Sequence, residues 1–540
     1  MSKQGSTNTL LPERVDVYDT TLRDGCQAED VSFTVADKLR VVRLLDDLGV
    51  HYIEGGWPSS NPKEMRFFEE AQELSLKHAQ ITAFGSTHKA SVVVEDDKNL
   101  KGLLACGANV LTIFGKSWDF HVTEALGIEL SRNLELIEST ISYLKAHRSV
   151  VFYDAEHFFD GYKADPEYAL TTLEAAAAGG ADNLVLCDTN GGSMPWEIKQ
   201  IMEVVRGRLD TPLGIHTHND SEMAVANALT AVQCGAVQVQ GTVNGFGERC
   251  GNANLLSVVA NLELKMGVKA LPEGGLANLK ETSAAVYELA NLPHNKHQAY
   301  VGEAAFAHKG GIHVSAVEKN ASTYEHVRPE TVGNHRRVLI SDYSGRSNVL
   351  AKAREFGIDL SDNSVLSVKI LSDLKDLEAS GYQYEGAEAS FELLIHKAMG
   401  NHKPLFELSG FRVISSRRGP GEPSVSEAIV KVRVDGKEKN EVAEGDGPVN
   451  ALDLSLRKAL CEFYPEINDF RLLDYKVRVL TGAHGTASRV RVLVESGDAY
   501  GTWDTVGVST NIIEASYQAL VDAIEYRLCR DLYAKSVVDS

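Results

Sequence analysis

Residues 15–25 read Val15-Asp16-Val17-Tyr18-Asp19-Thr20-Thr21-Leu22-Arg23-Asp24-Gly25, and this first strand and turn decide between two fold classes. The apolar run from Val15 to Asp19 is a strand candidate, and it leads directly into a polar turn. A doubly wound nucleotide-binding sheet begins with a strand followed by a glycine-rich phosphate-binding turn. Because the turn from Thr20 to Gly25 lacks that glycine pattern, an open sheet of this kind is not favoured.

The same succession of a short apolar run and an amphipathic stretch recurs up to about residue 266. The helical stretches have apolar residues at helical spacing, as in Leu39, Val42, Leu45 and Leu48. Eight such units favour a closed (β/α)8 TIM barrel over an open sheet. The strand candidates are Val15 to Asp19, His51 to Glu54, Ile81 to Gly85, Val110 to Phe114, Val150 to Asp154, Leu184 to Asp188, Gly214 to His218 and Val237 to Thr242.

The pattern changes twice after the barrel. Residues 271–403 predict a linker region of helices and irregular segments. Residues 404–540 predict a C-terminal α+β domain that duplicates a strand-strand-helix unit, because Ala428 to Val434 resembles Ser488 to Val494 and a helix follows each stretch. We therefore expect a catalytic barrel at 1–270, helical linker subdomains at 271–403, and a regulatory and dimerising domain at 404–540.

Composition excludes several classes of protein. Lys and Arg total 54 against 75 Asp and Glu, a formal charge of -21, which argues against a nucleic-acid or anionic membrane surface. The start, Met1 to Arg14, is polar, and no segment has the ~18 apolar residues of a membrane span, so the expected location is the cytoplasm. Seven scattered cysteines without CxxC spacing predict free thiols.

Polar residues follow three strands that a closed barrel makes neighbours. Asp24 follows the first strand, His216 and His218 end the seventh on one face, and Asn252 follows the eighth. This donor set suits a divalent cation, and Mg²⁺, Mn²⁺ and Zn²⁺ all remain open. Each part alone also has a structural interpretation: a structural His-x-His, a surface turn at Arg23 and Asp24, or a helix N-cap at Asp220. Their coincidence at one rim favours the metal site.

Three motifs carry a family resemblance. Asp19 to Gln27, His216 to Asp220 and Gly245 to Ala253 resemble motifs of the isopropylmalate, homocitrate and citramalate synthases, members of the DRE-TIM metallolyase superfamily. The resemblance extends over the whole chain, including the linker element Gly311-Ile312-His313 and the duplicated C-terminal domain. Within the family, Glu54 to Lys63 and Asp154 to Gly161 most resemble the citramalate synthase branch.

The resemblance implies roles for particular residues. Asp24, His216, His218 and Asn252 would hold the metal, and Arg23 would face the oxygen of the reacting carbonyl. The other residues with implied roles are Glu156 and His313 in proton transfer, with His313 contributed across a dimer, Tyr324 as a family tyrosine, and Thr189 on the substrate carboxylate. Gln27, inside the first motif, is a further candidate for substrate binding and for orienting Arg23 or Asp24. Glu156 could instead form a surface ion pair, His313 could be a satisfied loop histidine, and Thr189 and Tyr324 could serve in packing.

The implied reaction is condensation of acetyl-CoA with a 2-keto acid, with pyruvate as the expected substrate and citramalate and CoA as products in isoleucine synthesis. The resemblance also implies a homodimer and a branched-chain amino acid effector, isoleucine or leucine, near Gly445 to Pro448 and Ala483 to Thr486. Three alternatives stay open: 2-isopropylmalate or homocitrate synthesis, a metal-dependent carbon-carbon lyase, and a catalytically silent amino-acid-binding protein.

Overall fold

The computed structural model describes residues 11–417, 419–480 and 488–538. The chain folds into two compact units, Met1–Phe306 with Val327–His335, and Ala307–His326 with Arg336–Ser540. Each unit has its own hydrophobic core. The predicted effector segment Ala483 to Thr486 lies outside the described residues.

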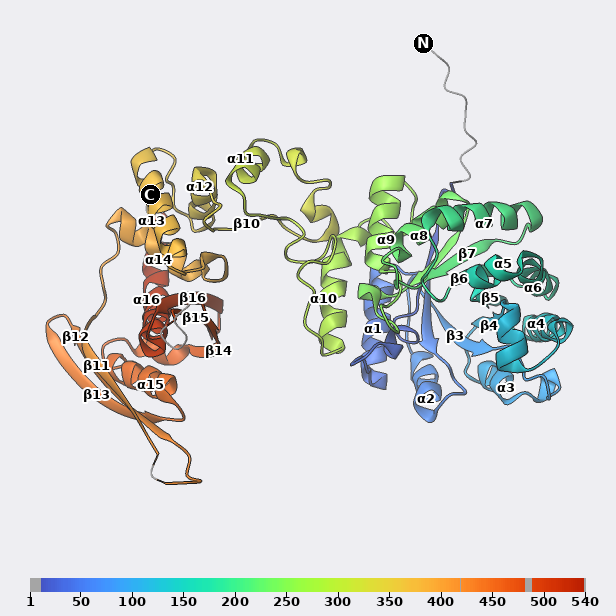
Figure 1. Ribbon diagram of the computed structural model, residues 1–540, viewed down its shortest axis with the longest axis horizontal. Helices are drawn as coiled ribbons and strands as arrows, with labels where there is room; N and C mark the ends of the chain where they lie inside the picture. Colours follow the sequence, from blue (N-terminus) through green and yellow to red (C-terminus); the bar gives the residue numbers. More distant parts are fainter. Residues whose placement is uncertain (1–10, 418, 481–487, 539–540) are drawn as a thin grey trace, which may run out of the picture. The chain divides into compact units, whose positions relative to one another are not determined.

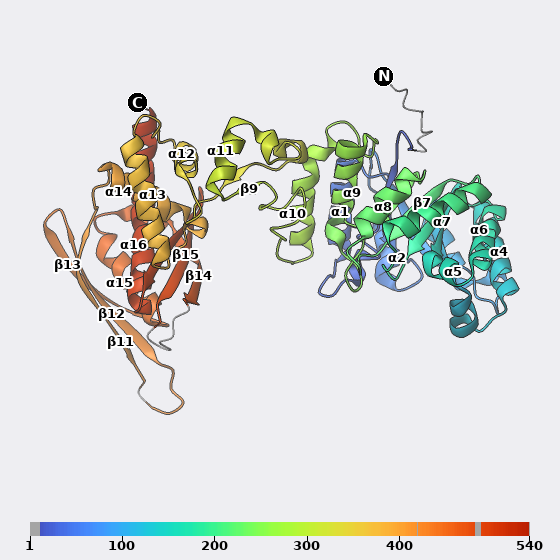
Figure 2. The same cartoon turned by 45° about the horizontal axis from the view of Figure 1, so that its top comes forward.

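The first unit contains a closed parallel barrel (Figures 1 and 2). The barrel closes because β1 pairs with β2 on one side and with β8 on the other. The predicted (β/α)8 fold is confirmed, and each strand candidate matches an observed strand to within two residues at either end. The strands are β1 Asp16–Asp19, β2 Tyr52–Gly56, β3 Gln80–Ser86, β4 Val110–Lys116, β5 Val150–Glu156, β6 Asn183–Asp188, β7 Leu213–Thr217 and β8 Gln238–Gly241.

Helices between the strands cover the outside of the barrel. Local chemistry sets their ends: α1 begins with a capping box between Thr34 and Asp37 and ends at Gly49, whose φ of 95° favours glycine. The helices of this unit are α1 Val35–Leu48, α2 Pro62–Ala71, α3 Lys98–Ala105, α4 Leu130–Lys145, α5 Phe158–Ala164, α6 Pro166–Ala178, α7 Pro195–Arg208, α8 Ala224–Gln233, α9 Leu255–Asn261 and α10 Leu279–Leu289. Among the described residues, no helix is long and apolar enough to cross a membrane.

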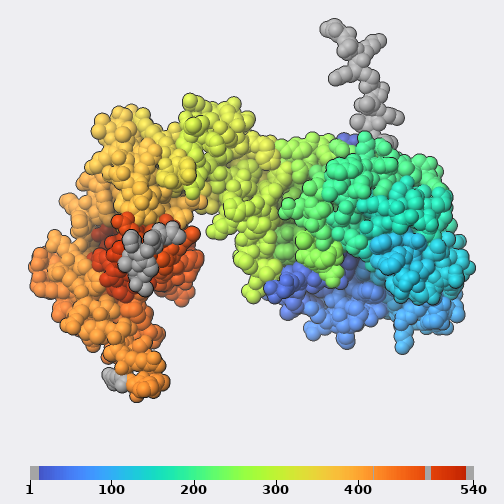
Figure 3. All heavy atoms as spheres, viewed as in Figure 1, coloured from blue at the N-terminus to red at the C-terminus, as the bar shows by residue number. Residues whose placement is uncertain are grey.

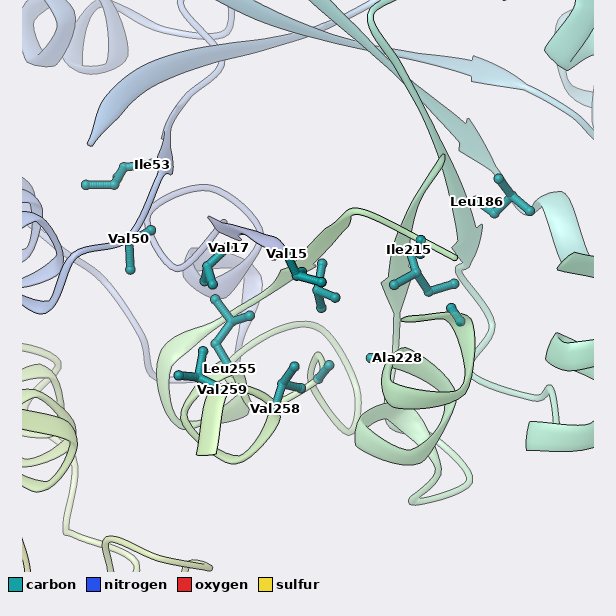
Figure 4. Close-up of a cluster of buried hydrophobic side chains, with 14 of the residues drawn as sticks. Val15, Val17, Val50, Ile53, Leu186, Ile215, Ala228, Leu255, Val258 and Val259 are labelled. Atoms are coloured by element: carbon teal, nitrogen blue, oxygen red, sulfur yellow. The ribbon is translucent and has the colours of Figure 1, made fainter. Parts of the chain in front are cut away.

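The alternation of strand side chains separates an apolar shell from a polar interior. Figure 4 shows Val17 of β1 beside Leu255 and Val259 of α9, in the layer between strands and helices. The next residue, Tyr18, points into the barrel, where its hydroxyl donates to Glu54 Oε1 at 2.5 Å. The barrel interior therefore holds buried polar side chains, and these build the site described below.

The second unit begins with the linker subdomain. Its core is formed by the buried residues Ile370, Leu374 and Phe391. The predicted helical character of this region is confirmed, with one short parallel strand pair in addition. The elements are β9 Ala307–His308, α11 Gly311–Lys319, β10 Arg337–Val338, α12 Arg346–Glu355, α13 Ser364–Ala379 and α14 Glu388–Met399.

The C-terminal domain consists of two copies of one motif, as predicted, but each copy has three antiparallel strands rather than two. The first strand of each copy, β11 and β14, was missed because none of its side chains is fully buried, so its apolar alternation is weak. Figure 3 shows the β11–β12 hairpin projecting from this unit. The elements are β11 Glu407–Ser416, β12 Val425–Val434, β13 Lys437–Gly445, α15 Pro448–Leu460, β14 Arg471–Val479, β15 Val490–Asp498, β16 Gly501–Ser509 and α16 Ile512–Val538.

Candidate active site

A cavity of about 250 Å³ opens at the carboxyl ends of the barrel strands. This is the end at which TIM-barrel enzymes carry their catalytic groups. The lining combines charged side chains with an aromatic wall. The lining residues are Arg23, Asp24, Gln27, Trp57, Phe84, Phe114, Asp154, Glu156, Cys187, Thr189, His216, His218, Glu248 and Arg249.

Three predicted metal ligands converge in this cavity. Asp24 Oδ2 lies 3.3 Å from His216 Nε2 and 3.7 Å from His218 Nε2, and the two imidazole nitrogens are 3.3 Å apart. All three side chains are buried. Residues separated by about 190 positions meet because β1, β7 and β8 are adjacent in the closed barrel.

The surroundings of this cluster favour an ionised Asp24 and a neutral His218. Burial opposes ionisation of Asp24, but the neighbouring Arg23 and His216 hold the pKa of its carboxyl well below the usual range. Burial opposes protonation of His216, yet its hydrogen bond with Asp24 raises its pKa overall. Burial and the neighbouring His216 lower the pKa of His218 to about 3. A carboxylate oxygen and two imidazole nitrogens at these distances are the donor types that bind a divalent cation.

Asn252 is brought to the same cluster by the loop after β8. An antiparallel bridge pairs Asn252 with His218, and the Asn252 amide donates to Phe246 O at 3.1 Å. In the described part of the chain, Asn252 Oδ1 is buried without a hydrogen-bond partner. Gly247 leaves room for this side chain, since a Cβ there would lie 2.3 Å from Asn252 Nδ2. This buried, unpaired oxygen is a donor of the kind that divalent cations bind, on a residue paired with His218.

Arg23 is held beside this cluster by Glu54, to which the sequence interpretation assigned no individual role. Arg23 Nε donates to Glu54 Oε2 at 2.5 Å, and an Arg23 terminal nitrogen lies 3.4 Å from Asp24 Oδ2. The guanidinium carbon stands 3.7 Å from the centre of the Phe84 ring, a cation-π contact. Burial lowers the pKa of Arg23 but the charge of Glu54 more than compensates, so Arg23 stays cationic.

Two further buried residues received no individual role from the sequence, and both lie within strands rather than after them. Gln240 of β8 lies between His216 and Asp154 of β5, at 3.0 Å from each. Burial, followed by the nearby charge of Glu54, raises the pKa of Asp154 to about 7. Inward-facing polar residues at strand ends are the signal that identifies them, once the direction of each strand is known.

Glu156 and Thr189 lie at the edge of the cavity. Glu156 forms an ion pair with Lys116 while also lining the cavity. The backbone NH of His157 donates to Thr189 Oγ1 at 2.9 Å, which leaves the Thr189 hydroxyl hydrogen available for another acceptor. Gln27 lines the cavity too, but within the described residues no side-chain hydrogen bond joins it to Arg23 or Asp24.

Two other charged residues at this rim form a surface ion pair. Arg249 donates to both carboxylate oxygens of Asp220, at 2.8 and 3.0 Å. Asp220 thus forms an ion pair with Arg249 and does not join the cluster around Asp24.

The cysteines are free thiols, as the sequence predicts. Cys26 donates to Leu22 O, and it is one of seven free cysteines.

His313 and Tyr324 belong to the second unit. Their ring centres are 4.2 Å apart, and both side chains are exposed. An imidazole against a phenol on a surface is a pair that can reach an external partner. The structure therefore places His313 and Tyr324, both predicted site residues, in contact with each other on the surface of the second unit.

Fold and site together define a class: a TIM barrel with a carboxylate, two imidazoles and an arginine at the carboxyl ends of its strands. The HMGL-like family matches residues 14–286, and the chain belongs to this family. The homocitrate synthase post-HMGL domain-like family matches residues 300–381, and the LeuA allosteric (dimerisation) domain matches residues 385–528.

Full-length relatives narrow the class further. The chain is similar to (R)-citramalate synthases, with 59% identity to that of Geobacter sulfurreducens over 95% of this chain and 97% of the relative. Identity is 52% with the (R)-citramalate synthase of Aquifex aeolicus, over 96% and 99% of the two chains. A probable 2-isopropylmalate synthase of Methanopyrus kandleri is 32% identical over 96% and 99%.

Proposed function

We propose that this chain is an acetyl-CoA:2-keto acid C-acetyltransferase that converts acetyl-CoA, pyruvate and water to (R)-citramalate and CoA. The observation that carries the proposal is the cationic Arg23, which Glu54 and Phe84 fix beside Asp24 and the two imidazoles. Positive charge at this position stabilises the negative charge that develops on the keto oxygen. The identity to (R)-citramalate synthases over nearly the whole chain supports pyruvate as the keto acid.

Asp24, His216, His218 and Asn252 are the residues that would hold a divalent cation. When bound, such an ion supplies Lewis-acid polarisation of the keto carbonyl. Arg23 stabilises the alkoxide oxygen as it forms. The hydroxyl hydrogen of Thr189 donates to the keto-acid carboxylate, because the oxygen of this hydroxyl already accepts from the His157 backbone.

The condensation needs one proton removed and one returned. A base takes a proton from the acetyl methyl group, the resulting enolate carbon forms a bond with C2 of the keto acid, and the alkoxide takes up a proton. Water then cleaves the thioester, giving the second carboxylate and the CoA thiol. We assign the base role to Glu156, which the Lys116 ammonium holds at the cavity edge. We assign protonation of the alkoxide to His313, contributed across a homodimer, and to Tyr324, whose ring centre lies 4.2 Å from that of His313.

The aromatic wall of Trp57, Phe84 and Phe114 bounds the cavity on one side. Selection of pyruvate over 2-ketoisovalerate then rests on volume, and each additional methylene is worth ~1–3 kcal/mol in such a pocket. A panel of pyruvate, 2-ketobutyrate, 2-ketoisovalerate and 2-ketoglutarate tests this, with CoA release measured by a thiol reagent.

We expect the highest kcat/KM with pyruvate. A preference for 2-ketoisovalerate or 2-ketoglutarate would instead assign 2-isopropylmalate or homocitrate synthesis. Absence of CoA release with every keto acid, together with cleavage of a hydroxyacyl-CoA, would assign a carbon-carbon lyase. Asp24→Ala is the matched negative control, and loss of metal by chelation is expected to stop CoA release until Mg²⁺ or Mn²⁺ is restored.

The regulatory role belongs to the same proposal. We keep the division into 1–270, 271–403 and 404–540 as a proposal. Three separate family matches, at residues 14–286, 300–381 and 385–528, support three regions but have other boundaries. We assign a homodimer as the oligomeric state. We also assign inhibition by isoleucine or leucine, bound near Gly445 to Pro448, as expected for an enzyme at the entry to isoleucine synthesis. Sedimentation and the same assay with each amino acid added test both assignments. The cytoplasmic location stays a prediction.

A further inference from the structure

A chain of buried hydrogen bonds runs behind the imidazole of His216, on the side away from Asp24. Gln240 Nε2 donates to Asp154 Oδ1 at 3.0 Å, and Gln240 Oε1 lies 3.0 Å from His216 Nδ1. Gln240 is fully buried, and Asp154 and His216 are nearly so. These residues come from β8, β5 and β7, so the chain of contacts crosses the barrel interior. The condensation as described assigns no step to Gln240 or Asp154.

The carboxylate of Asp154 determines which way the Gln240 amide points. The NH2 group of the Gln240 amide donates to Asp154 Oδ1, so the carbonyl end of the same amide faces His216 Nδ1. A carbonyl oxygen only accepts hydrogen bonds, so His216 Nδ1 carries the hydrogen. In the neutral imidazole the lone pair then lies on Nε2, the atom 3.3 Å from Asp24 Oδ2.

We propose that Gln240, oriented by Asp154, is a positioning residue that fixes His216 in the tautomer and ring orientation needed to bind a divalent cation through Nε2. This inference rests on the metal site of the proposed function. The support is specific to one of the two imidazoles: in the described structure His218 Nδ1 is buried without a hydrogen-bond partner. Gln240 therefore orients His216, whose Nδ1 has a hydrogen-bond partner, and not His218.

The size of the effect follows from the general behaviour of residues that hold metal ligands. Removing such a partner of a ligating histidine weakens metal binding by about 10–100-fold, because the ring loses its preferred tautomer and orientation. A purely structural role would lower stability and leave the metal affinity of the folded protein unchanged. Metal affinity, measured on folded protein, is thus the readout that separates the two roles.

The test is titration of the metal-free, full-length protein with Mn²⁺ by isothermal calorimetry. The variants are Gln240→Met, which keeps the side-chain length without hydrogen bonding, and the double variant Asp154→Asn/Gln240→Glu. In the double variant the donor and acceptor exchange places, and a carboxylate oxygen still accepts from His216 Nδ1. Gln238→Met is the matched control, since Gln238 is a buried residue of the same strand whose contact with Gln240 is 3.5 Å.

We expect Gln240→Met to bind Mn²⁺ about 10–100-fold more weakly than wild type, the double variant to recover to within about threefold, and Gln238→Met to stay within about twofold. Circular dichroism establishes that each variant is folded. Wild-type affinity in folded Gln240→Met would overturn the inference, as would equal losses in both Met variants or no recovery in the double variant. His216→Ala with unchanged affinity would instead reject the metal site itself, and with it the inference.

Discussion

The buried ion pair of Arg23 and Glu54 gives the sharpest test of how this site is held. Glu54→Gln removes one charge while keeping the volume of the side chain. Glu54 is fully buried, and its two oxygens accept from Arg23, Tyr18 and Thr20. Removing one partner of a buried pair costs about 3–5 kcal/mol, because the remaining charge stays in a low-dielectric site. Since Arg23 keeps Asp24 at 3.4 Å, we expect about 3 kcal/mol, the lower end of that range.

Urea unfolding followed by tryptophan fluorescence measures this loss in the barrel, because Trp57, Trp118 and Trp196 of the four tryptophans lie in the first unit. We also expect kcat/KM for pyruvate to fall about 100-fold as the guanidinium moves. The matched control is Glu64→Gln, which breaks the buried pair with Lys38. Lys38 does not line the cavity, whereas Arg23, the partner of Glu54, does. Glu64→Gln should lose similar stability and keep its activity. A Glu54→Gln enzyme within about 1 kcal/mol of wild type, or fully active, would refute the reasoning.

Three further outcomes are expected. Arg23→Lys should lower kcat at least about 100-fold while Mn²⁺ affinity is retained, because an ammonium lacks the planar fork that Glu54 holds; equal losses in both would contradict this. Gly247→Ala should weaken Mn²⁺ binding, since its Cβ would displace the Asn252 amide, whereas Gly207→Ala, on the open surface of α7, should not. Cys529 and the carboxylate of Glu525 raise the pKa of His402 to about 9. Protonated His402 therefore contributes at most about 3 kcal/mol to the free energy of unfolding of the second unit. This contribution is fully present below pH ~6.5 and is lost as the pH rises to ~9. In denaturant titrations across this range His402→Gln should remove the slope, and an unchanged slope would assign it to another group.

Much of the barrel could be predicted from local pattern. Strands such as Val110–Lys116 begin as short, mostly apolar runs because their first residues are buried, and the helices between the strands have a single apolar face. The same reasoning failed at β11 and β14, where partial exposure of both faces removes the alternation on which pattern depends. Pattern alone therefore recovers buried elements better than exposed ones.

The sequence by itself determined the repeating order of strands and helices, the acidic character of the chain and the ligand types at Asp24, His216 and His218. These properties depend on residue type and short spacing, so they are present in the linear chain. Only the tertiary structure decided that Glu54 holds Arg23 and that Gln240 lies between His216 and Asp154. Such contacts arise from barrel closure and from the direction in which each strand side chain points. A hydrogen bond between strands that are distant in the sequence produces no periodic residue pattern from which it could be predicted.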